Sequence, residues 1–458
     1  MTEYRPDPRL LGLGPQFYDP VEAADFPQCV RRFANDRWAA RVGLELDEEG
    51  WASHFCHFQP LPNNLPQPLA LRYHGHQFRV YNPEIGDGRG FTFAQLRDDR
   101  GRLLDLGTKG SGQTPYSRRG DGRLTLKGGV REVLATEMLE ALGVNTSKSF
   151  ALFETGEELD RGDEPSPTRS AVLTRLSHGH IRIGTFQRLA FFGQTDDLNA
   201  LTRYCLENLY ADAPGDDDSD NALRLFDRAC AATATLAASY FAAGFVHGVL
   251  NSDNINITGE SLDYGPWRFT PFWEPEFTAA YFDHAGLYAF GRQPEAIHWD
   301  LVQLAGCLAV VADAPALSDL LADWSARFED SLTAALLRRL GIDAGDNDRV
   351  IAGALIRALA TRTQTIDRIF FDWRGGRDPG AEDYPADQFR ELAKLLHGRE
   401  RPPTHGYWSD PAPCSMHIDE VEHIWSAIAE RDDWQEFNNK VKAIRRMGDA
   451  VEQDAPER

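Results

Sequence analysis

The sequence predicts an α+β fold with two lobes: a small β-rich N-terminal lobe with one key helix, and a larger, mostly helical C-terminal lobe. Two alternating runs, FTFAQLRD and RLLDLGTK, are joined by Asp99-Arg100-Gly101 and predict a β-hairpin. Apolar residues at helical spacing in LKGGVREVLATEMLEALG predict the key helix. Helical patterns dominate the second half, so we expect the N-terminal lobe at residues 69–184 and the C-terminal lobe at 185–375.

Both ends of the chain are expected to be extensions of this core. Residues 1–68 are rich in proline and aromatic residues, which favours an irregular segment packed on the core. Residues 376–458 carry helical patterns, broken near PAPCSM, and are expected to form a helical C-terminal extension. His54 and His57 flank Cys56, but no further clustered ligands follow, so packing is favoured over a metal site.

Composition and charge exclude several classes of function. The 458 residues carry a net charge of -22, so a nucleic-acid partner is not expected, although a local basic pocket can still hold a nucleotide. The N-terminus lacks the features of a signal peptide, and no apolar stretch is long enough to span a membrane. The six cysteines are scattered without a C-x-x-C, which indicates neither a disulfide framework nor a zinc ribbon. We expect a soluble, cytoplasmic protein.

The most informative stretch is His247–Gly265, HGVLNSDNINITGESLDYG. Aligned with the protein-kinase catalytic loop H-R-D-L-x-x-x-N, it keeps His247 and Asn254 in register, and D-Y-G follows where kinases have D-F-G. Val249 replaces the catalytic aspartate, and it can neither accept a proton nor bind a metal. A new acidic residue, Asp253, directly precedes the asparagine. The pattern therefore predicts a protein-kinase-like fold with altered chemistry.

Two side chains of this stretch supply the oxygen ligands that a divalent cation on a phosphate prefers. They are Asn254 and Asp263, which we expect to bind Mg²⁺, with Mn²⁺ also possible. The alternation from Asn254 to Thr258, with a turn at Gly259, predicts a short hairpin between them. The alternative is a surface hairpin rich in Asn and Asp without a ligand.

The N-terminal lobe carries the elements expected around a phosphate chain. In Gly86-Asp87-Gly88-Arg89-Gly90, small residues allow backbone N–H groups to approach phosphate, although such a loop is often an ordinary turn. Lys109 ends the second strand and Glu132 lies in the key helix, which is the arrangement of the ion pair that positions phosphates in kinases. A surface ion pair is the alternative.

Further basic residues follow these elements. A second Gly-Asp-Gly-Arg stands at 120–123, between Lys109 and the helix. Arg175 lies on a predicted strand and Arg182 in a polar loop, and arginine binds phosphate bidentately even when buried. A kinase does not ordinarily need both arginines, so this pocket is expected to hold the terminal phosphates rather than donate them.

These motifs occur together and in order. The series reads YHGHQF, NPEIGDGRG, KGSGQTPYSRRGDGR, VREVLATEML, the RL-x5-R that ends at Arg182, HGVLNSDN and DYGPW. Over residues 73–300, about half of the chain, it resembles the selenoprotein O (YdiU, UPF0061) family, kinase-like proteins that transfer AMP to proteins. The C-terminal third, including SDPAPCSMHIDEVEHIW, does not follow the pattern associated with that family.

The resemblance implies a role for each matching residue. Asp253 would be the proton acceptor, and Lys109, held by Glu132, would clamp phosphates. Asn254 and Asp263 would bind magnesium. The nucleotide would lie reversed relative to kinases, with the γ-phosphate buried and the α-phosphorus offered to a Ser, Thr or Tyr hydroxyl of a protein substrate. The residues implied to contact ATP are Gly86, Gly88, Arg89, Lys109, Asp121, Gly122, Arg175, Arg182 and Asp263.

Two other functions remain open from the sequence. A conventional kinase would transfer the γ-phosphoryl group of ATP. A catalytically silent pseudokinase scaffold would bind ATP without transferring anything. Retention of both Asn254 and Asp263 favours an enzyme over the scaffold.

Overall fold

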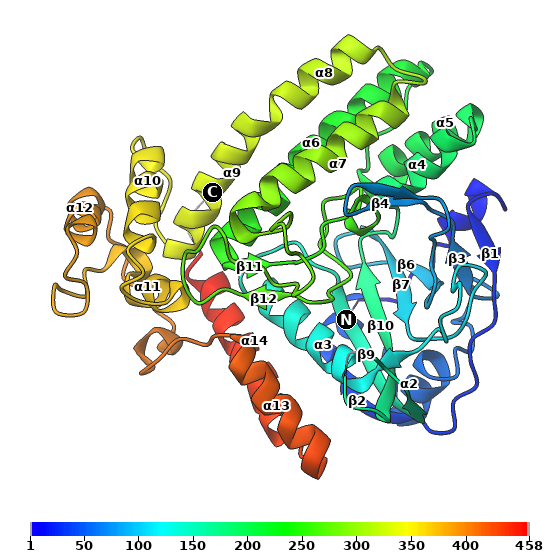
Figure 1. Cartoon of the computed structure of the whole chain (residues 1–458), viewed down its shortest axis with the longest axis horizontal. Helices are drawn as coiled ribbons and strands as arrows, with labels where there is room; N and C mark the ends of the chain where they lie inside the picture. Colours follow the sequence, from blue (N-terminus) through cyan, green and yellow to red (C-terminus); the bar gives the residue numbers. More distant parts are fainter. Residues whose placement is uncertain (1, 163, 456–458) are drawn as a thin grey trace.

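The computed structural model of the chain describes residues 2–162 and 164–455. It combines an antiparallel sheet, formed by the first 180 residues or so, with a helical portion formed by the rest. Figure 1 shows the sheet strands on one side of the molecule and the helices after α6 (Asp218–Ala243) largely on the other. The α+β class predicted from the sequence is therefore confirmed.

The sheet has eight strands in the described part of the chain, and every pairing in it is antiparallel. The predicted hairpin is present, with Arg97 opposite Leu103 across the turn. Across the sheet the strands follow the order β1 (Tyr18–Pro20), β3 (Leu69–Leu71), β6 (Thr92–Arg97), β7 (Leu103–Lys109), β10 (Thr168–Ser177), β9 (Lys148–Leu159) and β2 (Val30–Ala34), and β8 (Leu124–Thr125) pairs with β10.

The N-terminal segment is more regular than its composition predicts. Its strands β1 and β2 form the two edges of the sheet, and it also contains helices α1 (Asp36–Arg41) and α2 (Glu48–Phe55). The prolines are compatible with this arrangement because β1 is short and lies at an edge, where a missing N–H costs no ladder bond. The expectation of irregular chain was thus wrong for these elements.

One disulfide, which the cysteine spacing did not indicate, joins Cys29 to Cys56. It ties the segment just before β2 to the residue that follows α2. The other four cysteines are free thiols, and Cys205, Cys230 and Cys307 among them are buried. Scattered spacing is a poor guide here because the bridge depends on how the N-terminal segment folds back on itself.

The predicted key helix is α3 (Leu126–Ala141). It begins where the Thr125 side chain accepts a hydrogen bond from the N–H of Gly128, and Gly143 with a positive φ follows its end. Val130, Leu134 and Met138 are fully buried, as the helical spacing predicts. The helix packs against β9 and β10 on one side and the C-terminal helix α14 (Gln435–Gln453) on the other.

The second half of the chain is helical, as its periodicity predicts. The long helix α6 ends at Gly244, whose left-handed backbone turns the chain into β11 (Phe245–Val246) and then His247. The remaining helices are α4 (Ile183–Phe191), α5 (Thr195–Tyr204), α7 (Gln293–Leu308), α8 (Ala314–Ala322), α9 (Trp324–Leu340), α10 (Asp348–Leu359), α11 (Ile366–Asp372), α12 (Asp387–Leu396) and α13 (Ile418–Arg431).

Two short sheets complete the fold. Strand β4 (Gly75–Gln77) pairs with β5 (Val80–Asn82), and β11 pairs with β12 (Arg268–Phe269). The predicted hairpin after Asn254 is absent. The turn at Gly259 exists, but the flanking residues form isolated bridges to Arg182 and to Thr146 instead of pairing with each other. None of the helices described here is long and apolar enough to cross a membrane.

Candidate active site

A cavity of about 810 Å³ brings together residues from both halves of the chain. Its walls carry eight basic and five acidic side chains, an excess of positive charge in a chain whose net charge is -22. Glu132 lies behind Lys109 and not on the cavity wall. The cavity is lined by every other residue singled out from the sequence: Gly86, Gly88, Arg89, Lys109, Asp121, Gly122, Arg175, Arg182, Asp253, Asn254 and Asp263.

Lys109 and Glu132 form a buried ion pair. The Lys109 Nζ lies 2.5 Å from the Glu132 Oε2, and both residues are at most 5% exposed. Burial lowers the pKa of Lys109, and Glu132 opposes that shift. The pair joins the end of β7 to α3, so it is not the surface pair considered from the sequence. It fixes the ammonium group at the cavity wall.

Asp263 is held by two buried arginines. Its Oδ1 lies 2.5 Å from the Arg175 Nη1 and its Oδ2 lies 3.0 Å from the Arg182 Nη2. Burial alone would raise the pKa of Asp263, but Arg175, Arg182 and then Lys109 outweigh it and hold the pKa well below its usual value. The carboxylate is therefore ionised and acts as the counter-charge of the arginines.

Asp253 lies in the same cavity in a different environment. It is 9% exposed, and its Oδ1 has no hydrogen-bond partner in the described part of the chain. Burial raises the pKa of Asp253 to about 6, although Arg182 opposes the shift. The neighbouring backbone is close, since a Cβ added to Gly75 would lie 2.9 Å from the Asp253 Cβ. Asp253 is thus a carboxylate near its titration point with a free oxygen.

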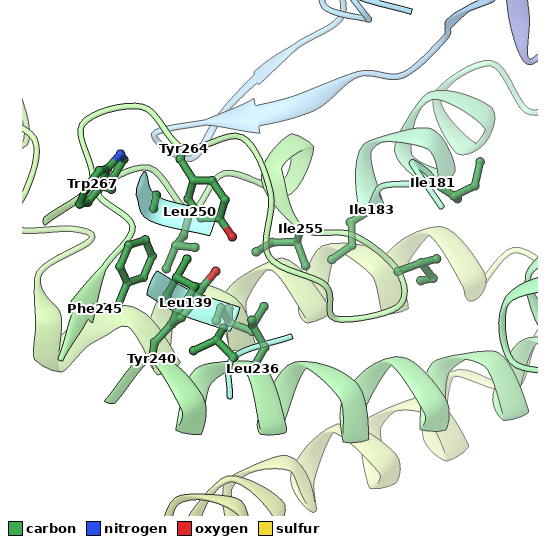
Figure 2. Packing of buried hydrophobic residues seen from close by; sticks show 14 of the residues in the cluster. Leu139, Ile181, Ile183, Leu236, Tyr240, Phe245, Leu250, Ile255, Tyr264 and Trp267 are labelled. Carbon is green, nitrogen blue, oxygen red and sulfur yellow. The ribbon is translucent and has the colours of Figure 1, made fainter. Parts of the chain in front are cut away.

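Apolar side chains anchor the loop that carries Asp253, Asn254 and Asp263. Figure 2 shows its residues Leu250, Ile255 and Tyr264 packed among buried side chains of α3 and α6. A hydrogen bond also holds the loop, since the His247 Nε2 lies 2.9 Å from the Leu262 carbonyl oxygen. Asn251, Asp253, Asn254 and Asp263 face the cavity. Asn256 and Thr258 instead donate to the carbonyl oxygens of Gly179 and His178, so the alternating stretch pairs with a distant segment and not with itself.

The glycine loop is shaped by an aromatic neighbour. A Cβ added at Gly86 would lie 2.5 Å from the ring of Tyr116, so the ring occupies the space of a side chain there. The N–H groups of Gly88 and Arg89 have no acceptor among the described residues. These two N–H groups are the ones that the glycine loop would offer to a phosphate, as expected from its small residues. Tyr116 was not singled out from the sequence, and no local signal marks it.

The second glycine motif lies at the mouth of the cavity. Asp121 pairs with Arg161 at 2.8 Å and accepts a hydrogen bond from the N–H of Arg123. Gly122 has a positive φ, and a Cβ there would lie 2.2 Å from the Gly112 carbonyl oxygen. The motif is thus a tight turn as well as part of the cavity wall.

The residues expected to bind a metal fit a hard cation. The Asn254 Nδ2 donates a hydrogen bond to the Val249 carbonyl oxygen at 3.0 Å, which leaves the Oδ1 as the atom that could bind a cation. Asp263 supplies carboxylate oxygens to the same cavity. No cluster of three or more His, Cys, Asp or Glu that would hold a metal occurs in the part of the chain described. Two oxygen donors suit Mg²⁺, which keeps waters and phosphate oxygens as its other ligands.

The fold places a cavity with an excess of basic side chains between the two parts of the chain, and its charge suits a polyphosphate. The Asp253 carboxylate lies in the same cavity. Comparison with known proteins points to enzymes that use nucleotides. The family model "Protein adenylyltransferase SelO" matches residues 1–388. A protein nucleotidyltransferase YdiU from Synechococcus elongatus is 48% identical over 97% of this chain and 96% of its own. One from Synechocystis sp. is 41% identical over 96% of this chain and 97% of its own.

The chain therefore belongs to the protein adenylyltransferase SelO family. The relatedness extends beyond the central half on which the motifs depend, because these relatives align with nearly the whole chain. The family model ends at residue 388, so it also covers part of the C-terminal third, in which the sequence alone showed no family pattern.

Proposed function

We propose that this protein transfers AMP from ATP to Ser, Thr or Tyr hydroxyl groups of other proteins and releases pyrophosphate. Membership of the protein adenylyltransferase SelO family supports the proposal. So do the relatives named protein nucleotidyltransferase. The fold we propose is the kinase-like one of two lobes, with the cavity between the sheet and the helical portion.

One observation supports the mechanism. The loop His247–Gly265 presents two carboxylates to the cavity, Asp253 and Asp263, and their electrostatic environments are opposite. Asp263 is ionised and bound by arginines, whereas Asp253 has a raised pKa and a free oxygen. A base near its titration point is the better proton acceptor at neutral pH. Asp253 then accepts the hydroxyl proton as the hydroxyl oxygen attacks the α-phosphorus, and Val249 leaves the usual kinase position without a base.

The buried cations hold the phosphate chain. Arg175 and Arg182 lie deep in the cavity, and their partner Asp263 is a carboxylate that a phosphate group can replace. Lys109, fixed by Glu132, stabilises charge as pyrophosphate leaves. The remaining contacts come from Gly86, Gly88, Arg89, Asp121 and Gly122. Burial of the cations favours the γ-phosphate at the deep end and the α-phosphate near Asp253.

Asn254 and Asp263 would hold Mg²⁺, or Mn²⁺ in its place. With phosphate oxygens on Arg175 and Arg182, the Asp263 carboxylate would be free to serve as a ligand. The cation would neutralise charge on the phosphates.

The deciding experiment compares two labels. Purified protein is incubated with a cell lysate and either α-³²P-ATP or γ-³²P-ATP, and labelled proteins are separated by electrophoresis. Label from the α-phosphorus alone is the expected result. Label from the γ-phosphorus would establish a conventional kinase and overturn the proposal.

A matched variant separates the enzyme from a scaffold. Asp253→Asn keeps the shape of the side chain and removes the base, so α-label transfer should be lost while ATP still raises the melting temperature. If neither label is transferred by the wild-type protein, although ATP stabilises it, the scaffold is the correct account.

A further inference from the structure

A second cavity, of about 500 Å³, adjoins the first. It shares several walls with the candidate active site, namely Tyr73, Ile85, Tyr116, Arg118 and Arg119. Its remaining walls are His74, Pro83, Glu84, Pro115 and Arg188. All of these walls except Arg188 belong to motifs of the series, but the proposed chemistry gives this second cavity no role.

Ile85 connects the second cavity to the proposed base. A Cβ added at Gly75 would lie 3.1 Å from the Ile85 Cδ1 and 2.9 Å from the Asp253 Cβ. Ile85 and Asp253 therefore flank the same backbone position. A polypeptide whose hydroxyl residue reached Asp253 would have its neighbouring residues within reach of the second cavity.

Arg118 and Arg119 are unusual among the basic residues of this chain. Both are exposed, and neither has an acidic partner in the described part of the chain. Most other arginines pair with a carboxylate or a carbonyl oxygen, as expected in so acidic a protein. Arg118 also has a φ of 53°, a backbone conformation that non-glycine residues rarely adopt. Two uncompensated positive charges thus stand together at the shared wall.

The loop that carries these arginines is held rigidly to the glycine loop. The Thr114 Oγ1 donates to the Asp87 carbonyl oxygen at 2.5 Å, and the Ser117 hydroxyl donates to the Gly88 carbonyl oxygen. The Tyr116 ring fills the space over Gly86. The arginine backbone is therefore pre-organised, which lowers the entropy lost when the side chains bind a partner.

The charge of the second cavity favours an anionic occupant. Arg118, Arg119 and Arg188 line it, and Glu84 is its single acidic side chain. Burial lowers the pKa of His74 to about 4, so this histidine is neutral and adds no positive charge. The cavity therefore carries a net positive charge next to the proposed base.

We propose that Arg118 and Arg119 bind an acidic side chain of the acceptor protein, close in sequence to the hydroxyl residue that is modified. This inference rests on the proposed function and specifies its substrate class. The phosphates of ATP are the competing anion, but Lys109, Arg175 and Arg182 already supply buried cations for them. Arg118 and Arg119, which are exposed on the wall shared by the two cavities, therefore remain free to bind a ligand from solvent.

The test uses synthetic peptides with one central Ser, Thr or Tyr, flanked by Asp and Glu, by neutral residues, or by Lys and Arg. Transfer from α-³²P-ATP is measured for the full-length wild-type protein and for Arg118→Ala/Arg119→Ala. Arg100→Ala is the matched control, because Arg100 is exposed, its side chain makes no hydrogen bond or ion pair in the described part of the chain, and it lies outside both cavities. Affinity for a non-hydrolysable ATP analogue is measured for each protein.

The wild-type protein should prefer acidic peptides, and the double variant should raise the KM for them about tenfold while the ATP affinity and melting temperature stay unchanged. Arg118→Glu/Arg119→Glu should shift the preference to basic peptides, and Arg100→Ala should behave as wild type. Wild-type transfer without charge preference would overturn the inference alone, as would a parallel loss of ATP affinity. No transfer to any peptide or lysate protein would instead overturn the proposed function.

Discussion

The Arg175 guanidinium and the Asp263 carboxylate lie 2.5 Å apart, so a residue expected to bind phosphate is paired with one expected to bind metal. Each satisfies the other's charge inside a buried cavity, where an unpaired ion would cost several kcal/mol. In the proposed complex, a phosphate on Arg175 and a cation on Asp263 would replace this contact by two others. Arg175 and Asp263 would therefore each have a partner of opposite charge both without and with the proposed ligand.

Substitution of the proposed base should separate transfer from binding. Asp253→Asn is expected to reduce AMP transfer by about 10²-fold to 10⁴-fold, because general-base catalysis is lost. Calorimetric ATP affinity should remain within about twofold of wild type. Full activity of this variant would contradict the assignment of Asp253.

The pH dependence of transfer should report the same residue. The pKa of Asp253 is raised to about 6 by burial, and only the ionised form accepts a proton. The rate should therefore fall about tenfold for each pH unit below 6, measured as kcat/KM under conditions where the protein stays folded. A flat profile between pH 5 and pH 7 would exclude Asp253 as the base.

The free energy of unfolding should depend on the ionisation of Asp253 in the opposite direction to the rate: it should fall as pH rises. Because the folded pKa lies above the unfolded one, the folded state binds the proton more tightly, and stability is lost as pH rises from about 4 to about 6. Asp253→Asn is expected to raise the free energy of unfolding at pH 7 by about 3 kcal/mol. Denaturant titrations at pH 5 and pH 7 would show this difference, and equal effects at the two pH values would argue against it.

Loss of the Lys109 ammonium should affect both activity and stability. Lys109→Ala leaves the fully buried Glu132 with only Arg175 as a partner, at 3.5 Å. We expect the free energy of unfolding to fall by about 3 kcal/mol and transfer to fall by about 10²-fold. Lys127→Ala, which breaks the more exposed pair with Glu422, is the control and should cost less than about 1 kcal/mol. Unchanged turnover in the Lys109 variant would refute the phosphate clamp.

The contact between Gly86 and Tyr116 can be tested by a double-mutant cycle. Gly86→Ala places a methyl group against the ring, and the resulting overpacking should cost about 1–3 kcal/mol and weaken ATP binding. Tyr116→Ala should relieve the clash, so the double variant is expected to lose less than the sum of the two single variants. Additive effects on unfolding would show that the ring does not restrict position 86.

The Cys29–Cys56 disulfide should stabilise the N-terminal segment. Chain-entropy arguments for a loop of this length give about 3 kcal/mol, which reductant or Cys29→Ser should remove. A thiol titration of denatured, unreduced protein should count four free thiols. A count of six would show that the bridge does not form.

Much of the fold and site could be predicted from the sequence. The β6–β7 hairpin, helix α3 and the strand that carries Arg175 follow from periodicity and turn residues, because local patterns report which face of an element is buried. The full set of lining residues was expected only from the resemblance to the selenoprotein O family, whose motifs stand in order along the chain. The prediction of a hairpin after Asn254 was wrong because distant contacts outweigh the local pattern there. The buried residues in Figure 2 and the bridges to Arg182 and Thr146 determine the conformation of that backbone.

The sequence by itself determined which side chains we propose to act on a phosphate: Lys109, Glu132, Arg175, Arg182, Asp253 and Asp263 in that order, with Val249 in place of a kinase base. Only the tertiary structure decided how they are paired. Arg175 and Asp263 are 88 positions apart in the sequence but form an ion pair. The Oδ1 of Asp253 has no hydrogen-bond partner in the described part of the chain. The physical reason is that residue type sets what a group can do, whereas burial and the distance to other charges set its protonation state and its partner.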